Sequence, residues 1–80
     1  MRQFRPSRVK VPEKAHPLVR RLFQEMAFQQ VGLADLAERS GVSRETISAW
    51  RYRQSPSVTS LEACLGVLDL RLRISHDNQP

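Results

Sequence analysis

Apolar residues recur at helical spacing along most of the chain. Leu18, Leu22 and Met26 repeat every four residues after Pro17, and proline is tolerated at the first position of a helix. This pattern predicts an amphipathic helix of roughly 14 residues that ends near Gln30. Similar patterns predict three further helices, over residues 33–40, from 44 to 52 or 53, and from 58 or 59 to 68.

The hydrophobic period changes to two near the C-terminal end. Leu70, Leu72 and Ile74 alternate with arginines, which predicts a short β-strand over residues 70–75. A lone strand leaves its edge N–H and C=O groups unpaired, so it needs a partner. The candidates are residues 8–11 and the same segment of a second chain. We favour the second chain and therefore expect these three apolar residues to mediate homodimerisation.

Residues 33–50, LADLAERSGVSRETISAW, have the spacing of two short helices that cross over a tight turn. Ala37 supplies the small residue needed where the helices touch. Gly41 accepts the left-handed conformation that the turn requires, and Ser43 is placed to cap the next helix. The apolar anchors before and after the turn are Leu36, Val42, Ile47 and Trp50.

These residues carry a family resemblance. The run LAERSGVS at 36–43, followed by Ile47, Ser48 and Trp50 and later by Pro56 and Ser57, resembles the lambda-repressor/Cro-like (XRE-type) family of helix-turn-helix regulators. The resemblance covers about residues 18–69. It implies a helical, usually dimeric protein that binds double-stranded DNA in a sequence-specific manner.

The fold class expected from these patterns is all-α. Four to five short helices surround a central helix-turn-helix, and a short C-terminal β-strand serves dimerisation. The expected organisation is a basic N-terminal arm at 1–15, a helix-turn-helix domain at 16–69, a strand at 70–75 and a polar tail at 76–80.

The resemblance places the recognition helix at about 43–53, with its N-terminal half in the major groove. Arg44 is the first candidate for a base contact, to guanine O6 and N7, and Glu45 either accepts from a cytosine amino group or orients Arg44. The remaining groove candidates are Thr46 and Ser48 for phosphate or base, and Ala49 for a thymine methyl. The phosphate candidates are Ser43, Arg51, Arg53, Gln54 and Ser57, with Thr59 beside them.

Two aromatic residues of this segment have different expected roles. Trp50 is expected in the core, whereas Tyr52 is open to DNA contact or to a dimer surface. The family often has a polar residue where Leu33 stands, which contacts a phosphate, and less basic residues where Arg51 and Arg53 stand. The phosphate grip is therefore expected to shift towards the C-terminal end of the recognition helix.

Charge agrees with a polyanionic partner. The chain has 13 Lys and Arg against 8 Asp and Glu, a formal net charge of +5, and the basic residues gather in residues 1–21. Nucleic acid is the first candidate for such a chain, although a basic tail also serves solubility alone. The arm either enters a minor groove, pairs with the C-terminal strand or takes no fixed structure.

Other function classes find little support. Cys64 is the only cysteine, expected in the core, and His16 and His76 are far apart, so no metal site, disulfide or cofactor is expected. No catalytic triad or phosphate-binding glycine loop occurs, so an enzyme is not expected. No apolar run reaches the roughly 18 residues of a membrane span, no signal-peptide core follows the charged N-terminus, and a reducing cytoplasmic location fits.

The favoured function is a small dimeric transcriptional regulator, repressor-like, that binds a palindromic operator with half-sites about 34 Å apart. One alternative is an antitoxin-like regulator that also binds a protein toxin through the arm or the C-terminal strand. RNA polymerase is a further possible protein partner. The alternative from another class is a protein-interaction module with the same shape that does not read DNA.

Overall fold

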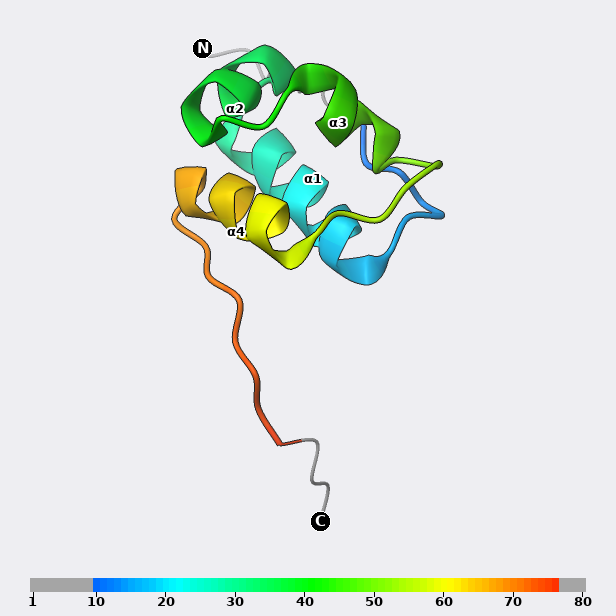
Figure 1. Cartoon of the computed structure of the whole chain (residues 1–80), viewed down its shortest axis with the longest axis vertical. Helices are drawn as coiled ribbons and strands as arrows, with labels where there is room; N and C mark the ends of the chain where they lie inside the picture. Colours follow the sequence, from blue (N-terminus) through cyan, green and yellow to red (C-terminus); the bar gives the residue numbers. More distant parts are fainter. Residues whose placement is uncertain (1–9, 77–80) are drawn as a thin grey trace, which may run out of the picture.

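The computed structural model describes residues 10–76, and four α-helices account for its regular structure. They are α1 (Pro17–Gln29), α2 (Leu33–Ser40), α3 (Arg44–Ala49) and α4 (Val58–Val67), which confirms the all-helical class (Figure 1). Helix α2 packs against both α3 and α4. Residues 1–9, which hold most of the expected basic arm, and the tail residues 77–80 lie outside the described residues.

Helix α1 begins and ends where local chemistry favours it. The His16 Nδ1 accepts a hydrogen bond from the Leu18 N–H at 3.0 Å, and Pro17 takes the first helical position. At the other end Gln30 adopts the left-handed conformation, with φ at 59°. Its N–H donates to the Ala27 carbonyl at 3.2 Å, which closes the last turn.

The turn between α2 and α3 is built as the sequence predicts. Gly41 has φ at 83°, a conformation that glycine adopts without steric cost, and its N–H donates to the Ala37 carbonyl at 2.9 Å. Ser43 then caps α3, because its Oγ accepts from the Thr46 N–H at 3.1 Å. These two local devices fix where α2 stops and α3 starts.

Helix α3 is shorter than predicted. The prediction extended it to residue 52 or 53, whereas the helix ends at Ala49 and turns follow. The Ala49 carbonyl accepts from the N–H groups of Arg53 at 2.8 Å and Gln54 at 3.0 Å, which folds the chain back over the helix end. Pro56 also disfavours helix at the residue before it.

The four helices enclose one apolar core. At roughly 1.5–3 kcal/mol for each large apolar side chain that is fully buried, this core is the main source of stability. The expected burial of Trp50 and Cys64 is confirmed. The largest fully buried side chains are Phe23, Leu22, Met26, Leu36, Ile47, Leu68, Val19 and Cys64.

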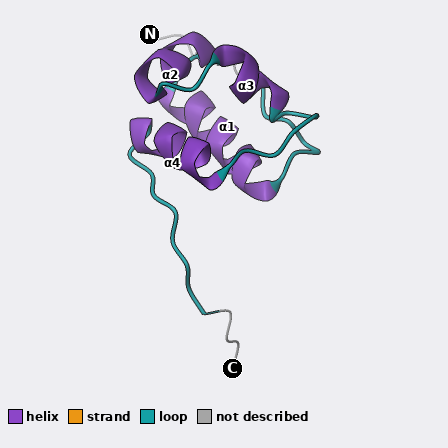
Figure 2. Cartoon of the chain, in the orientation of Figure 1, coloured by secondary structure: helices purple, strands orange, loops and turns teal. Residues whose placement is uncertain are grey.

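The prediction of a C-terminal β-strand is wrong for the described part of the chain. Residues 70–76 form no strand, and Figure 2 draws them as an extended loop that leaves the end of α4 and runs away from the helices. The physical reason is pairing: Lys10 and Val11, the described part of the 8–11 candidate, form no strand either. Only Leu70 is tied locally, through its N–H to the Leu65 carbonyl at 2.8 Å.

Candidate nucleic-acid interface

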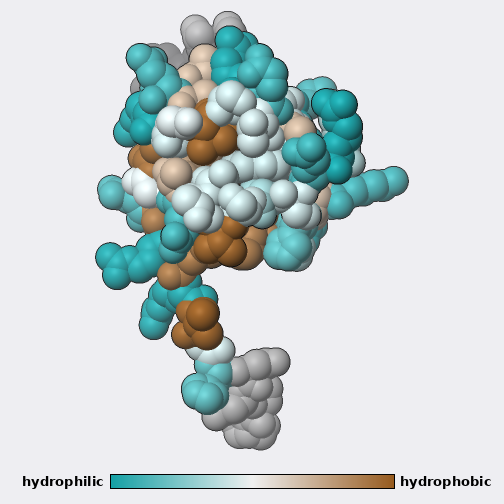
Figure 3. Space-filling model, in the orientation of Figure 1, coloured by the Kyte–Doolittle hydropathy of each residue, from teal (hydrophilic) through white to brown (hydrophobic). Residues whose placement is uncertain are grey.

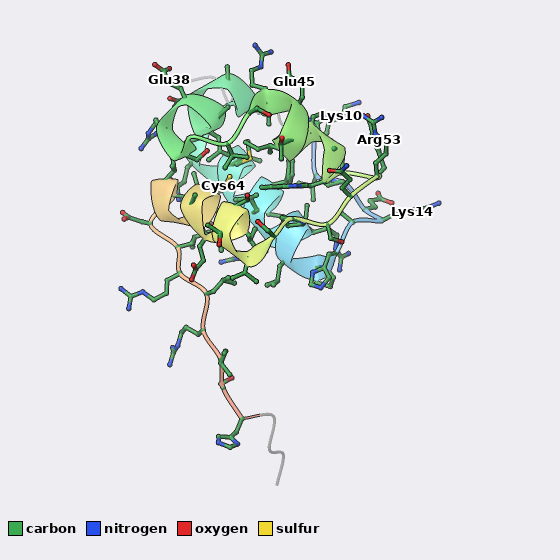
Figure 4. All side chains as sticks on the ribbon, in the orientation of Figure 1. Lys10, Lys14, Glu38, Glu45, Arg53 and Cys64 are labelled. Carbon is green, nitrogen blue, oxygen red and sulfur yellow. The ribbon has the colours of Figure 1, made fainter. Side chains whose placement is uncertain are left out.

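The first turn of α3 presents polar side chains to the exterior. Arg44, Glu45 and Thr46 are exposed, while Ile47 on the same helix is fully buried. Figure 4 shows Glu45 projecting from α3 away from the core. Burial of Ile47 fixes the rotation of the helix, and the cap at Ser43 fixes its start. The exposed turn is therefore held in a defined orientation by residues that do not belong to it.

The hydroxyl groups of Ser43 and Thr46 are engaged with each other. The Ser43 Oγ donates to the Thr46 Oγ1 at 2.8 Å while it accepts from the Thr46 N–H. Ser43 thus uses its hydrogen and one lone pair in the cap. Thr46 accepts here, so its own hydroxyl hydrogen stays available to an external acceptor.

The outward orientation predicted for Ala49 is wrong. Its side chain is 8% exposed, among the buried residues. The chain turns back onto the Ala49 carbonyl after this position, so the helical projection of an unbroken helix does not apply there. Ser48, its neighbour, is half-buried. The groove-facing set predicted from sequence therefore loses one apolar member.

Arg51 is held against the core. Its guanidinium carbon lies 5.4 Å from the centroid of the Phe23 ring, within the range of a cation–π contact. The Arg51 Nε is buried and has no hydrogen-bond partner. The side chain predicted as a phosphate ligand is thus half-buried and fixed in place.

The residues after α3 form an exposed polar rim. Tyr52 is 68% exposed, and the Arg53 guanidinium carbon lies 5.7 Å from the centroid of its ring. Gln54 and Ser57 are also exposed. Ser57 caps α4 through its Oγ, which accepts from the Ser60 N–H at 3.1 Å. Four of the predicted phosphate or DNA contacts are therefore accessible beside the end of α3.

Leu33, the residue that replaces a polar side chain common in the family, packs against the core at the start of α2. The preceding Gly32 supplies no side-chain cap to that helix. Leu33 therefore helps to anchor α2 and has no polar group to offer a phosphate.

The segment before α1 brings two further polar residues to the same region. Lys14 and His16 line a cavity of about 230 Å³ together with residues 50–55. Lys14 belongs to the basic arm at 1–15, for which a minor-groove contact was one expectation, but neither residue was named individually as a site residue. The only sign of them was the concentration of basic residues before α1, because their proximity to residues 50–55 is a tertiary contact.

Cys64 and the other candidate metal ligands provide no second type of site. Burial raises the pKa of the Cys64 thiol, although a hydrogen bond with Ser40 acts in the opposite direction. Across residues 10–76, no group of three His, Cys, Asp or Glu side chains is arranged to hold a metal ion. None of the four described helices has the length and apolar character needed to cross a bilayer.

Two short helices joined by a glycine-capped turn, the second with an exposed polar first turn, define a helix-turn-helix module. A sequence model of the helix-turn-helix family matches residues 19–74, well over half of the chain. The chain belongs to this family, of the lambda-repressor/Cro-like (XRE) type, and is a DNA-binding regulator of that type. This confirms the resemblance carried by residues 36–57. The family is not an enzyme family. No curated protein and no solved structure matched the chain.

Proposed function

We propose that the protein is a repressor-like regulator that binds double-stranded DNA in a sequence-specific manner as a homodimer. The observation that carries the proposal is the first turn of α3, where Arg44, Glu45 and Thr46 are exposed while Ile47 is buried. A rigidly oriented helix start with exposed polar side chains fits the major groove, where each base pair presents a distinct pattern of donors and acceptors.

Within this proposal each exposed side chain has a chemical role. Arg44 donates to guanine O6 and N7, and Glu45 accepts from a cytosine amino group. Thr46 donates its free hydroxyl hydrogen to a base or phosphate oxygen, with Ser48 at the edge of the contact. Ala49 is omitted because its side chain is buried.

The phosphate grip is proposed for the rim after α3. Arg53, Gln54 and Ser57 are exposed there, and Tyr52 adds a hydroxyl. Contacts of this kind set the register of the protein on the duplex without reading sequence. Leu33, at the other end of the module, lacks the polar group for such a contact.

Dimerisation is proposed through the apolar side of residues 70–74. Leu70 and Leu72 pack partly against the core, whereas Ile74 is 101% exposed. Figure 3 shows an apolar patch on this extended segment, next to hydrophilic side chains. Leu72 also lines an apolar cavity of about 190 Å³ with Leu18 and Val58. A second copy would cover these surfaces, and the proposal requires no strand.

The DNA-binding proposal is tested by selection from a random duplex pool at about 150 mM salt. We expect a symmetric motif, and we expect Arg44→Ala to relax one position per half-site at a cost of about 1–3 kcal/mol. Arg39→Ala is the matched control, because Arg39 is exposed on α2 and its guanidinium pairs with Asp35 at 3.4 Å. Binding without any selected motif, or identical motifs for Arg44→Ala and the unchanged protein, would contradict the proposal.

The dimer proposal is tested by sedimentation. Ile74→Glu places a charge where the unchanged side chain is fully exposed, so it leaves the fold of one chain intact. We expect this variant to sediment as a monomer. Phe28→Glu is the matched control, because Phe28 is also exposed, at 82%, but lies on α1. A dimer that persists in Ile74→Glu and dissociates in Phe28→Glu would move the interface to α1.

A further inference from the structure

The cavity between the segment before α1 and the turns after α3 has the composition of an anion site. It is an open depression in the surface, with a volume of about 230 Å³, so a phosphate group can enter it from solvent. Lys14, Arg51 and Arg53 contribute three basic side chains to its wall. No carboxylate of the described residues forms part of its wall.

One wall residue has a donor that its internal contact leaves over, and a second contributes a fixed charge. The His16 Nδ1 accepts from the Leu18 N–H, so in the neutral ring the hydrogen is on Nε2, which is a donor. The Arg51 Nε–H is buried out of reach of a bound anion, but the Phe23 ring, its centroid 5.4 Å from the guanidinium carbon, keeps this charged side chain beside the cavity. Its positive charge stabilises a nearby anion without a direct hydrogen bond from Nε.

The position of the cavity points to the source of the anion. Tyr52 and Arg53, which form part of its wall, belong to the turns directly after α3. Figure 4 shows Lys10, Lys14 and Arg53 on the same side of the molecule. An anion bound here lies at the end of the helix that the proposed function places in the major groove. The backbone beside that groove is a row of phosphate groups.

We propose that this cavity binds a phosphate group, supplied by the DNA backbone next to each half-site. The inference rests on the proposed function and deepens it, because it adds Lys14 and His16 to the phosphate grip. These two residues lie outside the helix-turn-helix. The bound phosphate bridges the segment before α1 to the turns after α3, so DNA binding also fixes that segment.

The test uses the full chain and the duplex found by selection. Lys14→Gln removes one charge from the cavity at an exposed position, and Arg39→Gln removes one charge elsewhere as the matched control. We expect Lys14→Gln to weaken all duplexes about equally, by about fivefold at 150 mM salt, and to reduce the salt slope by about one. One neutral methylphosphonate in each half-site should weaken binding to the unchanged protein and have little further effect on Lys14→Gln. If Lys14→Gln and Arg39→Gln bind the duplex with equal affinity and equal salt dependence, and the methylphosphonate weakens Lys14→Gln as much as the unchanged protein, the bound phosphate does not come from the DNA backbone.

A second arm tests a free phosphate without DNA. Inorganic phosphate is titrated against the fluorescence of Trp50, which also lines the cavity and is the only tryptophan. A response that is lost in Lys14→Gln, combined with DNA binding that does not depend on Lys14, assigns the cavity to a free phosphate and overturns the backbone source. Absence of Lys14 dependence in both arms overturns the site. A Lys14-dependent phosphate response without any selected duplex refutes the proposed function and leaves the site standing.

Discussion

A single methyl group added at Gly41 is expected to destabilise the protein, whereas the same group added at Gly66 is expected to stabilise it. A Cβ atom at either position meets no other atom within 4 Å, so neither substitution causes a clash. The difference is in the backbone. Gly41 has φ at 83°, in the left-handed region, while Gly66 lies within α4. The pair therefore isolates conformation from packing.

The size of each effect follows from the backbone alone. An L-residue in the left-handed region costs roughly 1–2 kcal/mol, and alanine regains about 0.4–1 kcal/mol by restricting the unfolded chain. Gly41→Ala should therefore lower the free energy of unfolding by about 1 kcal/mol. Gly66→Ala should raise it by about 0.5 kcal/mol, the lower end of the helix effect, because Gly66 is close to the end of α4. At 4–8 °C for each kcal/mol, the two melting temperatures should differ by roughly 10 °C.

The assay is thermal and urea unfolding at one fixed protein concentration, followed by circular dichroism and by Trp50 fluorescence. A fixed concentration is needed because a dimer links stability to concentration. Gly41→Asn is the control, since asparagine tolerates the left-handed region better than alanine and should recover part of the loss. If Gly41→Ala unfolds at the same temperature as Gly66→Ala, the left-handed turn between α2 and α3 is refuted.

Two smaller predictions concern contacts with α4 and the buried thiol. Gln29→Ala should lower the free energy of unfolding by about 0.5–1.5 kcal/mol, because the Gln29 Nε2 donates to the Leu68 carbonyl at 2.9 Å. Urea unfolding measures this change. The control is Gln24→Ala at an exposed position, which should change the free energy of unfolding by less than about 0.5 kcal/mol. Since burial raises the pKa of the Cys64 thiol above its ordinary 9.0, the thiol ionises first in the unfolded chain, and its contribution to stability should fall as the pH rises above that value. Urea unfolding at increasing pH should show this fall in the unchanged protein and a smaller one in Cys64→Ala; equal slopes would refute it.

Features decided by neighbouring residues could be predicted from the sequence. The start of α1 depends on His16 and Pro17, and the turn between α2 and α3 depends on Gly41 and Ser43. In each case the hydrogen bond that fixes the boundary joins residues at most four positions apart. The exposed first turn of α3 followed from the same local pattern, because burial of Ile47 sets the helix rotation.

Features decided by more distant parts of the chain could not be predicted in the same way. The end of α3 depends on how the chain after Ala49 folds back, and the burial of Ala49 depends on tertiary packing. The alternation of Leu70, Leu72 and Ile74 with arginines indicates an extended segment with one apolar side and one polar side, but it does not identify a partner for the backbone. A strand exists only when a second backbone pairs with it, so alternation is necessary and insufficient.

The candidate site divides along the same line. Arg44 and Glu45 could be named from their spacing to buried neighbours, whereas Lys14 could not, since nothing in its local sequence relates it to Arg53. Arg51 was named from the sequence as a phosphate ligand, but its contact with the core could not be predicted. Stacked on Phe23, it is a fixed positive charge at the end of α3 and needs little ordering when an anion binds. The apolar Leu33 gives the start of α2 no phosphate ligand. In the proposed complex, the preorganised charge of Arg51 therefore makes the end of α3 the stronger contact with the DNA backbone.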